Sequence, residues 1–234
     1  IDADNTANVT GVSLTGNPVS GTSLSKDDKL RPFIKHLYLE WSNFIVPNLT
    51  LRVGMTETLT FSLAEARWGY RSVAKTLLDG YKDITGKDIA ASSADIGASL
   101  GTSLTKFVRV NVMFANGGGY GHAEVDQYKK ISANIQLIPV AGFSLVGYLD
   151  YGGLLPKTAY PAETKPAAAT YKLDAYFDMV KNLTLGGEWL VYKNYLHQTT
   201  ELVKYNVGGW SVFGRYALNA KNLNAFARYD SYMP

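Results

Sequence analysis

The sequence predicts an all-β fold of long antiparallel strands, and three observations carry this prediction. Apolar and polar residues alternate with period 2 over ten segments, as they do in strands whose two faces meet different surroundings. Short and long connections between these segments alternate along the chain, and Trp and Tyr residues gather toward the segment ends. Together the three are typical of an antiparallel β-barrel that spans a membrane, with short turns at one rim and long loops at the other.

The clearest strands lie at 171–179 and 183–192. Odd positions from Tyr171 to Met179 are apolar or aromatic, and even positions from Lys172 to Asp178 are polar or aromatic. Only residues 180–182 separate the two segments, which is enough for a hairpin turn. A strand of about 10 residues, tilted by ~40°, spans the ~25 Å apolar band of an outer membrane. We therefore expect each segment to cross a bilayer.

Two regions of the chain are expected to differ in structure. Residues 1–31 are rich in Asn, Asp, Ser, Thr and Gly and are predicted to form a polar loop or arm, whereas residues 32–234 are predicted to form a transmembrane barrel segment. In it we expect five hairpins, with strands at 33–42 and 49–56, 94–101 and 106–115, 128–138 and 143–151, 171–179 and 183–192, and 205–218 and 223–230. The long connections are expected at 57–93, 116–127, 152–169 and 193–204.

The loop lengths and the aromatic residues favour a membrane barrel over a soluble one. A soluble β-sandwich or barrel, the alternative, has no reason to sort its loops by length onto one end. Eight aromatic residues stand at or toward predicted strand ends, where the aromatic girdles of membrane barrels lie. They are Trp41, Tyr151, Trp189, Tyr192, Trp210, Tyr216, Tyr229 and Tyr232.

Composition excludes several other classes. The most apolar run, 137–149, is interrupted by Pro139 and Gly142 and is shorter than the ~20 residues of a membrane-spanning helix. Charged residues make up 18% of the 234 residues, below the ~25% of a typical soluble protein. Cysteine is absent, which excludes disulfides and cysteine-ligated metals. A net charge of +3 is too small to indicate a nucleic-acid partner.

The loop at 57–93 carries the sequence's one helical signal. Ser62 and Glu65 have capping-box spacing, and apolar residues then recur at helical spacing, with Gly80 as the expected stop: Tyr70, Val73, Ala74, Leu77, Leu78 and Tyr81. Arg67, Arg71 and Lys75 stand four apart on the opposite side. These cations are either a solvated face at the barrel mouth or part of a constriction loop that folds into the lumen. Because the apolar stripe has to be buried, we expect the constriction loop, with its stripe on the inner wall.

Several segments resemble Gram-negative outer-membrane porins, most closely the phosphate-selective porin O and P type. The residues that carry the resemblance are Asn48–Gly54, Trp68–Asp79, Ser93–Gly101, Ser211–Tyr216 and Phe226–Asp230. The resemblance implies passive diffusion of small hydrophilic or anionic solutes through a water-filled, homotrimeric barrel of roughly 16 strands in the bacterial outer membrane. Its partners would be outer-membrane lipid and lipopolysaccharide. The strand directions at both ends also lead us to expect that this sequence is an inner segment of a longer barrel.

The candidate functional residues follow from parity, because polar strand positions would face the lumen. We expect Arg52, Arg109, Lys130, Asp174, Glu188, Arg215 and Arg228 to line the pore, and Arg67, Arg71 and Lys75 to face it from the constriction loop. No catalytic set, cofactor motif or metal-ligand spacing stands out, so an enzyme is not expected. Ionic selectivity stays open because the polar positions are nearly balanced in charge. Three alternatives also stay open: a sleeve around a partner such as a multihaem electron conduit, a structural outer-membrane anchor with a plugged lumen, and a soluble β-barrel binding protein.

Overall fold

The computed structural model describes residues 2–4, 7–8, 25–26, 31–81, 92–120, 129–152, 168–198, 201–218 and 223–233. The chain divides into two compact units, residues 1–37 and 38–234. In the first unit, β1 (Asp2–Asp4) pairs with β4 (Arg31–Phe33), and β2 (Ala7–Asn8) pairs with β3 (Ser25–Lys26). Neither pair was predicted from the sequence. The first long strand was predicted to begin at Phe33, which instead ends the separate strand β4.

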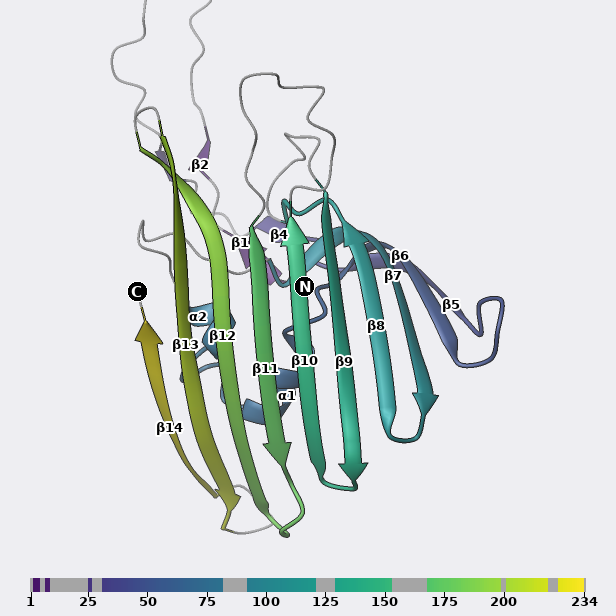
Figure 1. Ribbon diagram of the computed structural model, residues 1–234, viewed down its shortest axis with the longest axis vertical. Helices are drawn as coiled ribbons and strands as arrows, with labels where there is room; N and C mark the ends of the chain where they lie inside the picture. The colour runs from purple at the N-terminus through teal and green to yellow at the C-terminus, as the bar shows by residue number, and fades with distance from the viewer. Residues whose placement is uncertain are drawn as a thin grey trace, which may run out of the picture. The chain divides into compact units, whose positions relative to one another are not determined.

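The second unit is built on a ten-stranded antiparallel sheet in which each strand pairs with the next one along the chain (Figure 1). The strands are β5 (Leu37–Ser42), β6 (Leu49–Glu57), β7 (Ala94–Thr105), β8 (Val108–Ala115), β9 (Lys130–Val140), β10 (Phe143–Gly152), β11 (Ala169–Phe177), β12 (Leu183–Gln198), β13 (Glu201–Ala217) and β14 (Asn224–Met233). The prediction of ten strands in five hairpins is confirmed. Among the described residues, the edge strands β5 and β14 do not pair with each other, so the sheet is open.

Two connections differ from the prediction. Strand β7 continues to Thr105, so the turn lies at residues 106–107 and not at 102–105. The long loop expected at 193–204 is instead the end of the β12–β13 hairpin, whose strands stay paired up to Gln198 and Glu201. The polar residues there do not alternate with apolar ones, and so gave no strand pattern. Backbone pairing holds them in a hairpin because the ladder needs no apolar side chains.

The two faces of the sheet differ in composition. One side of the sheet is called the covered face. It carries the even-numbered residues of β5, β6, β9, β10, β11, β12 and β14 and the odd-numbered residues of β7, β8 and β13. This face is mainly polar, and much of it is buried. The opposite face, the apolar face, exposes large hydrophobic side chains on every strand, among them Leu39, Val53, Ile96, Val112, Leu137, Leu149, Leu173, Trp189, Val212 and Tyr229.

The predicted single helix is two short helices. Helix α1 (Ser62–Trp68) ends at Gly69, whose φ of +76° is left-handed, and α2 (Leu77–Gly80) follows after residues 70–76. Helical spacing of the apolar residues did not reveal this break, because one left-handed residue ends a helix without changing the spacing of the apolar residues around it. The expected stop at Gly80 is confirmed.

The loop that carries these helices packs against the covered face (Figure 1). Leu77 and Leu78 of α2 are fully buried against Leu190 and Val207 of the sheet. In a second cluster, Ala64 and Trp68 of α1 pack with Val146, Tyr176 and Phe213. The prediction that the apolar stripe lies on the sheet is confirmed for Leu77 and Leu78 but wrong for Val73, which is 62% exposed. The stripe packs on side chains of β10, β11, β12 and β13.

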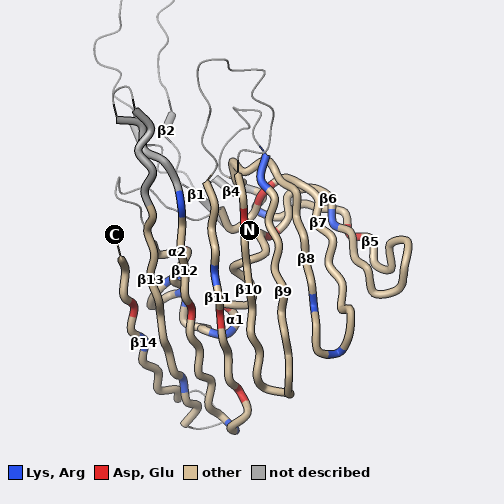
Figure 2. Tube along the Cα trace, in the orientation of Figure 1, with Lys and Arg blue, Asp and Glu red and all other residues tan. Residues whose placement is uncertain are grey.

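Charged residues are sparse on the described strands (Figure 2). Among the described helices, none is long and apolar enough to cross a membrane. Two of the eight aromatic residues that were predicted to form girdles, Tyr192 and Tyr232, lie on the covered face and pack against the loop. Trp189 and Trp210 are directly paired on the apolar face, and Trp210 lies 5.4 Å from Tyr229 between ring centroids. They stand within β12 and β13, because these strands are longer than predicted.

Candidate functional site

The covered face has two regions that differ in what lies above them. Over β10–β14, the loop at 58–81 packs closely on the sheet. Over β5–β9, the same face borders an open hollow of about 320 Å³. The candidate site consists of both regions, because the first fixes the loop and the second leaves polar side chains accessible.

A buried charge cluster lies beneath the loop. Lys172 Nζ is 2.6 Å from Asp174 Oδ2 and 3.3 Å from Glu188 Oε2, and all three side chains are nearly inaccessible. Asp174 on β11 pairs directly with Glu188 on β12, and Glu188 pairs with Ser211 on β13, so the groups form a row across the sheet. Within the described structure, neither oxygen of Glu188 has a hydrogen-bond donor. Lys172 is therefore the cation that keeps this carboxylate pair stable.

Strand β14 clamps the loop through aromatic contacts. Trp68 meets Phe226 edge-on, Tyr70 stacks on Phe226 at 4.2 Å, and Tyr81 stacks on Tyr232 at 4.6 Å between ring centroids. The Tyr81 hydroxyl donates a hydrogen bond to the carbonyl of Met233. Burial raises the pKa of Tyr81, which keeps this donor protonated. The clamp holds the loop near the C-terminal end of each of its two helices.

Arg228 is part of the same clamp. Its Nε donates to Asp230 Oδ1 at 2.7 Å, and its guanidinium carbon lies 5.0 Å from the centroid of the Trp68 ring. The Arg228 side chain is 5% exposed, so the loop covers it. This residue was predicted to line the pore, and the structure places it on the predicted face but beneath the loop.

The three loop cations do not share one helix face, because the helix ends at Gly69. Arg67 on α1 forms an ion pair with Asp178, beside the turn that follows β11. Arg71 pairs with Glu65 and Asp79, and Lys75 Nζ lies 3.6 Å from Asp79. Each of the three cations that were expected to face the pore therefore has a carboxylate partner. The carboxylates at 65, 79 and 178 neutralise these cations locally.

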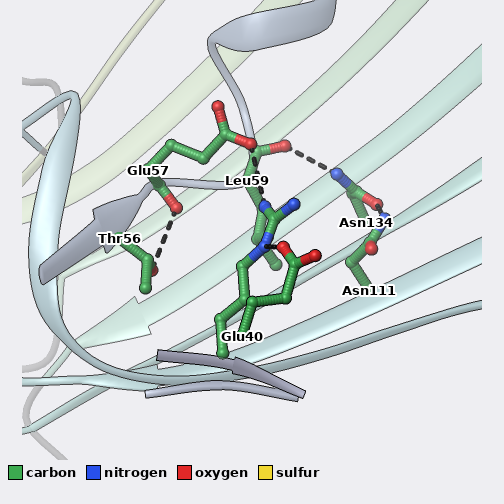
Figure 3. A network of polar contacts seen from close by, with 7 residues as sticks. Glu40, Thr56, Glu57, Leu59, Asn111 and Asn134 are labelled. Atoms are coloured by element: carbon green, nitrogen blue, oxygen red, sulfur yellow. Dashed lines mark hydrogen bonds and ion pairs between the residues drawn. The ribbon is translucent and has the colours of Figure 1, made fainter. Parts of the chain in front are cut away.

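Arg52 organises the hollow beside β5–β9 through its two carboxylate partners. Figure 3 labels these partners, Glu40 and Glu57. Arg52 Nε donates to Glu40 Oε2 at 2.7 Å, and Nη1 donates to Glu57 Oε1 at 3.2 Å. The three residues come from β5, β6 and the end of β6, so the guanidinium bridges the edge strand to the start of the loop. All three side chains stay about one-third or more exposed, and solute can reach them.

A chain of amides forms the floor of the hollow. Asn111 Nδ2 donates to Asn134 Oδ1 at 2.7 Å, and Asn134 Nδ2 donates to the carbonyl of Leu59 at 2.6 Å (Figure 3). This chain connects β8 and β9 to the first residues of the loop. Asn111 lies so close to Gly101 that a Cβ there would stand 2.3 Å from its Oδ1. Arg109, one position along the covered face of β8, also lines the hollow.

The remaining predicted residues lie elsewhere on the covered face. Lys130 Nζ is 3.6 Å from Asp150 Oδ2 at the loop end of β9 and β10. Arg215 lines a separate hollow of about 340 Å³ near the turn at 178–182, together with Tyr70 and Asp178. Of the ten predicted residues, the structure therefore brings Arg52 and Arg109 to one hollow and Asp174 and Glu188 to one buried cluster.

Sequence reasoning did not select Glu40, Glu57, Asn111, Asn134 or Lys172 as site residues. The parity of Glu40, Asn111, Asn134 and Lys172 places them on the polar face, but parity alone does not say which polar residues meet. Glu57 stands at the end of β6, where the alternation stops, and no sequence signal indicates its bond to Arg52.

The accessible side chains of the site are suited to binding polar groups through hydrogen bonds and ion pairs. Within the described ranges, no group of three or more His, Asp or Glu side chains could hold a metal ion. The accessible groups are two guanidiniums, two carboxylates, amides and hydroxyls, which bind polar solutes in water. No family model matches the chain, and no curated protein matches it.

Proposed function

We propose that the chain forms the wall of an outer-membrane porin, a water-filled channel for passive diffusion of small hydrophilic solutes, including anions. In this proposal the apolar face contacts outer-membrane lipid and, in the outer leaflet, lipopolysaccharide. The covered face borders the lumen. The assembled form is a homotrimer of barrels with roughly 16 strands each, as the porin resemblance implies.

The observation that carries the proposal is the inverted amphipathicity of the sheet. A soluble sheet buries its apolar face and exposes its polar one. Here charged side chains such as Lys172 and Glu188 are buried, whereas Leu39 and Leu173 on the other face are more than half exposed. Exposed apolar side chains recur on all ten strands, whereas the apolar patches of soluble monomers are confined to a limited part of the surface. A lipid environment accounts for this arrangement.

Strand dimensions also support a membrane location. On the apolar face of β10, Phe143 stands beside the short turn and Tyr151 toward the loop. The eight residue steps from Phe143 to Tyr151 correspond to ~26 Å along the strand, or ~20 Å across a bilayer at a tilt of ~40°. Phe177 pairs directly with Phe143, and Tyr171 lies beside Leu149, so the aromatic residues of β11 are six residue steps apart, or ~20 Å along the strand. Aromatic residues at these two levels fit the two interfaces of a bilayer.

Closure of the sheet is part of the proposal. The edges of β5 and β14 carry backbone groups that would be unpaired in hydrocarbon, at a cost of several kcal/mol each, so a membrane form has to close. Barrels of about eight strands are filled by their own side chains. A lumen that holds α1, α2 and an open hollow needs a wider barrel, which agrees with roughly 16 strands.

The solute path would follow the hollow beside β5–β9. The loop at 58–81 would narrow the lumen from the β10–β14 side, where Leu77, Leu78 and Trp68 fix it. Arg52, Arg109, Asn111 and Asn134 would then be the side chains that solutes meet. The buried residues Asp174, Glu188 and Arg228 would support the loop and not touch solute.

Planar-bilayer recording of the purified protein tests the proposal. We expect discrete, ohmic current steps whose conductance rises with salt concentration. A protein that inserts into the bilayer, as shown by flotation with vesicles, but conducts no current would contradict a channel.

One observation favours a second function, a structural anchor with a plugged lumen. The loop is held by fully buried residues and an aromatic clamp, and such a loop could close the lumen. Silence in the recording together with membrane insertion is the result that this second function predicts.

A further inference from the structure

The hollow beside β5–β9 contains positive and negative side chains whose charged atoms are not all paired. In the described part of the chain, the side chain of Arg109 makes no hydrogen bond or ion pair, although it lines the hollow. Glu40 and Glu57 each give one oxygen to Arg52. The second oxygen of each carboxylate has no donor among the described residues. The hollow therefore offers a cation at one place and two carboxylate oxygens at another.

These groups lie at opposite ends of the hollow. Arg52 pairs with Ser99 across β6 and β7, whereas Arg109 pairs with Ser103 across β7 and β8. The two arginines are thus two strands and four residues apart, which corresponds to about 16 Å between their backbones. Glu57 pairs with Ala94, so it lies farther along the strands from Arg109 than Arg52 does. Because the carboxylates and Arg109 line the same hollow, an elongated solute is needed to reach both ends.

Uncharged polar groups fill the space between the two ends. Asn111 and Asn134 provide amides, and Ser99, Thr102 and Ser103 provide hydroxyls along β7. Amides and hydroxyls pair with peptide N–H and C=O groups without adding charge. The formal charges of Glu40, Glu57, Arg52 and Arg109 sum to zero, so the hollow as a whole favours neither a free anion nor a free cation.

We infer that this hollow binds a short zwitterionic solute, a di- or tripeptide whose ammonium group meets Glu40 and Glu57 and whose carboxylate meets Arg109. The inference rests on the proposed function, since it names the solute class of the same path. The volume of about 320 Å³ accommodates a molecule of this size. Charge complementarity at both ends explains why a zwitterion suits the hollow better than other solutes.

Other solute classes leave at least one end of the hollow without a counter-charge. An anion that reaches Arg109 leaves the two carboxylates without a counter-charge. A cation that binds the carboxylates leaves Arg109 without a counter-charge. A neutral sugar would form hydrogen bonds with the amides but would leave the Arg109 guanidinium and both carboxylates without a counter-charge.

The test compares four probes of similar size by their block of the ion current at low salt. The probes are triglycine, N-acetyltriglycine, triglycine amide and a neutral oligosaccharide. We expect triglycine to block at a concentration about two- to fivefold lower than either singly charged form, which is the range for one half-exposed ion pair. Equal block by the three peptides, or strongest block by the sugar, would overturn the inference.

Two substitutions assign the ends. Arg109→Gln should weaken the block by triglycine and leave the block by triglycine amide unchanged, because the amide has no carboxylate. Glu57→Gln should weaken the block by triglycine and spare N-acetyltriglycine, which has no ammonium group. Lys106→Gln is the matched control, since Lys106 is an exposed cation of the same β7–β8 hairpin outside the hollow. If Lys106→Gln weakened the block by triglycine as much as Arg109→Gln does, the weaker block would come from the lost positive charge alone, and the site at Arg109 would be refuted.

Calorimetric titration of the detergent-solubilised protein separates this inference from the proposed function. If no current is seen but triglycine binds, and Arg109→Gln weakens that binding, the channel proposal fails and the peptide site stands. If current is seen without any difference among the probes, and calorimetry detects no binding of triglycine, the channel stands and the peptide site fails.

Discussion

Lys172 shows how a polar residue is kept beneath the loop. Its ammonium group is the cation closest to Asp174 and Glu188, and the side chains of all three are at most 5% exposed. Two carboxylates on directly paired strand positions would repel each other without it. Removal of one partner of a buried ion pair costs more than the pair contributes, because it leaves charge unpaired in a poorly solvated place.

We predict that Lys172→Met lowers the free energy of unfolding by ~3–5 kcal/mol. Urea unfolding in detergent or vesicles measures it. Lys181→Met is the control, since Lys181 is exposed in the turn before β12, and we expect it to change stability by less than ~0.5 kcal/mol. An effect of Lys172→Met as small as that of the control would contradict the role of Lys172.

Gly101 fixes the position of Asn111 by leaving space for it. A Cβ at this glycine would stand 2.3 Å from Asn111 Oδ1, so Gly101→Ala should push the amide away and break its bond to Asn134. We expect a loss of ~0.5–1.5 kcal/mol in the free energy of unfolding, the value of one hydrogen bond. Gly118→Ala is the control, because its Cβ would meet nothing within 4 Å. Equal stability of the two variants would show that the amide chain tolerates displacement.

The sequence predicted individual residues well where parity sufficed. Val112, Leu137 and Trp189 lie on the apolar face and Arg52, Arg109 and Lys130 on the covered face, as the alternation indicated. It did not predict which residues meet. The pairing of Arg52 with Glu40 and Glu57 depends on the loop path after β6, and the pairing of Arg67 with Asp178 joins residues far apart in the chain.

At the scale of elements, the loop at 58–81 depends on Trp68. The indole is 1% exposed and contacts Phe213 and Phe226, and its Nε1 donates to the carbonyl of Ala74 at 2.7 Å. It therefore joins α1, the segment after Gly69 and two strands of the sheet. The loop has no long helix of its own, so such contacts hold it in place.

We predict that Trp68→Ala releases the loop from the sheet, because truncation of a buried Trp costs ~3–5 kcal/mol. Amide hydrogen exchange across residues 62–81 measures the release. Val73→Ala is the control, since Val73 belongs to the same loop but is 62% exposed. Unchanged exchange in Trp68→Ala would mean that the clamp around Tyr81 suffices to hold the loop.

The strands could be predicted because their alternation extends over nine or more residues in most cases. The residues at which the strands begin and end were harder to predict. The extension of β12 and β13 to Gln198 and Glu201 adds polar residues that carry no alternation, and the break at Gly69 depends on one left-handed backbone conformation. Helical spacing is insensitive to such a break, so one helix was expected where there are two.

At the scale of the whole sheet, polarity is reversed with respect to a soluble protein. Ten strands expose Leu, Ile, Val, Trp and Tyr on one face, while charged and hydroxyl side chains lie against the loop on the other. The sequence predicted this reversal from composition and alternation. It could not give the division of the covered face into a filled and an open region, because that division follows from the packing of the loop.

Site-directed spin labelling in lipid vesicles tests the central claim, which is that the apolar face meets lipid and the covered face meets water. The chain has no cysteine, so single cysteines can be introduced cleanly. Neighbouring positions are matched pairs: Asn111 and Val112 on β8, and Gln136 and Leu137 on β9. We predict that labels at 112 and 137 collide mainly with oxygen and labels at 111 and 136 mainly with a water-soluble nickel complex. Water access at 112 and 137, or the same accessibility at both members of each pair, would contradict the account.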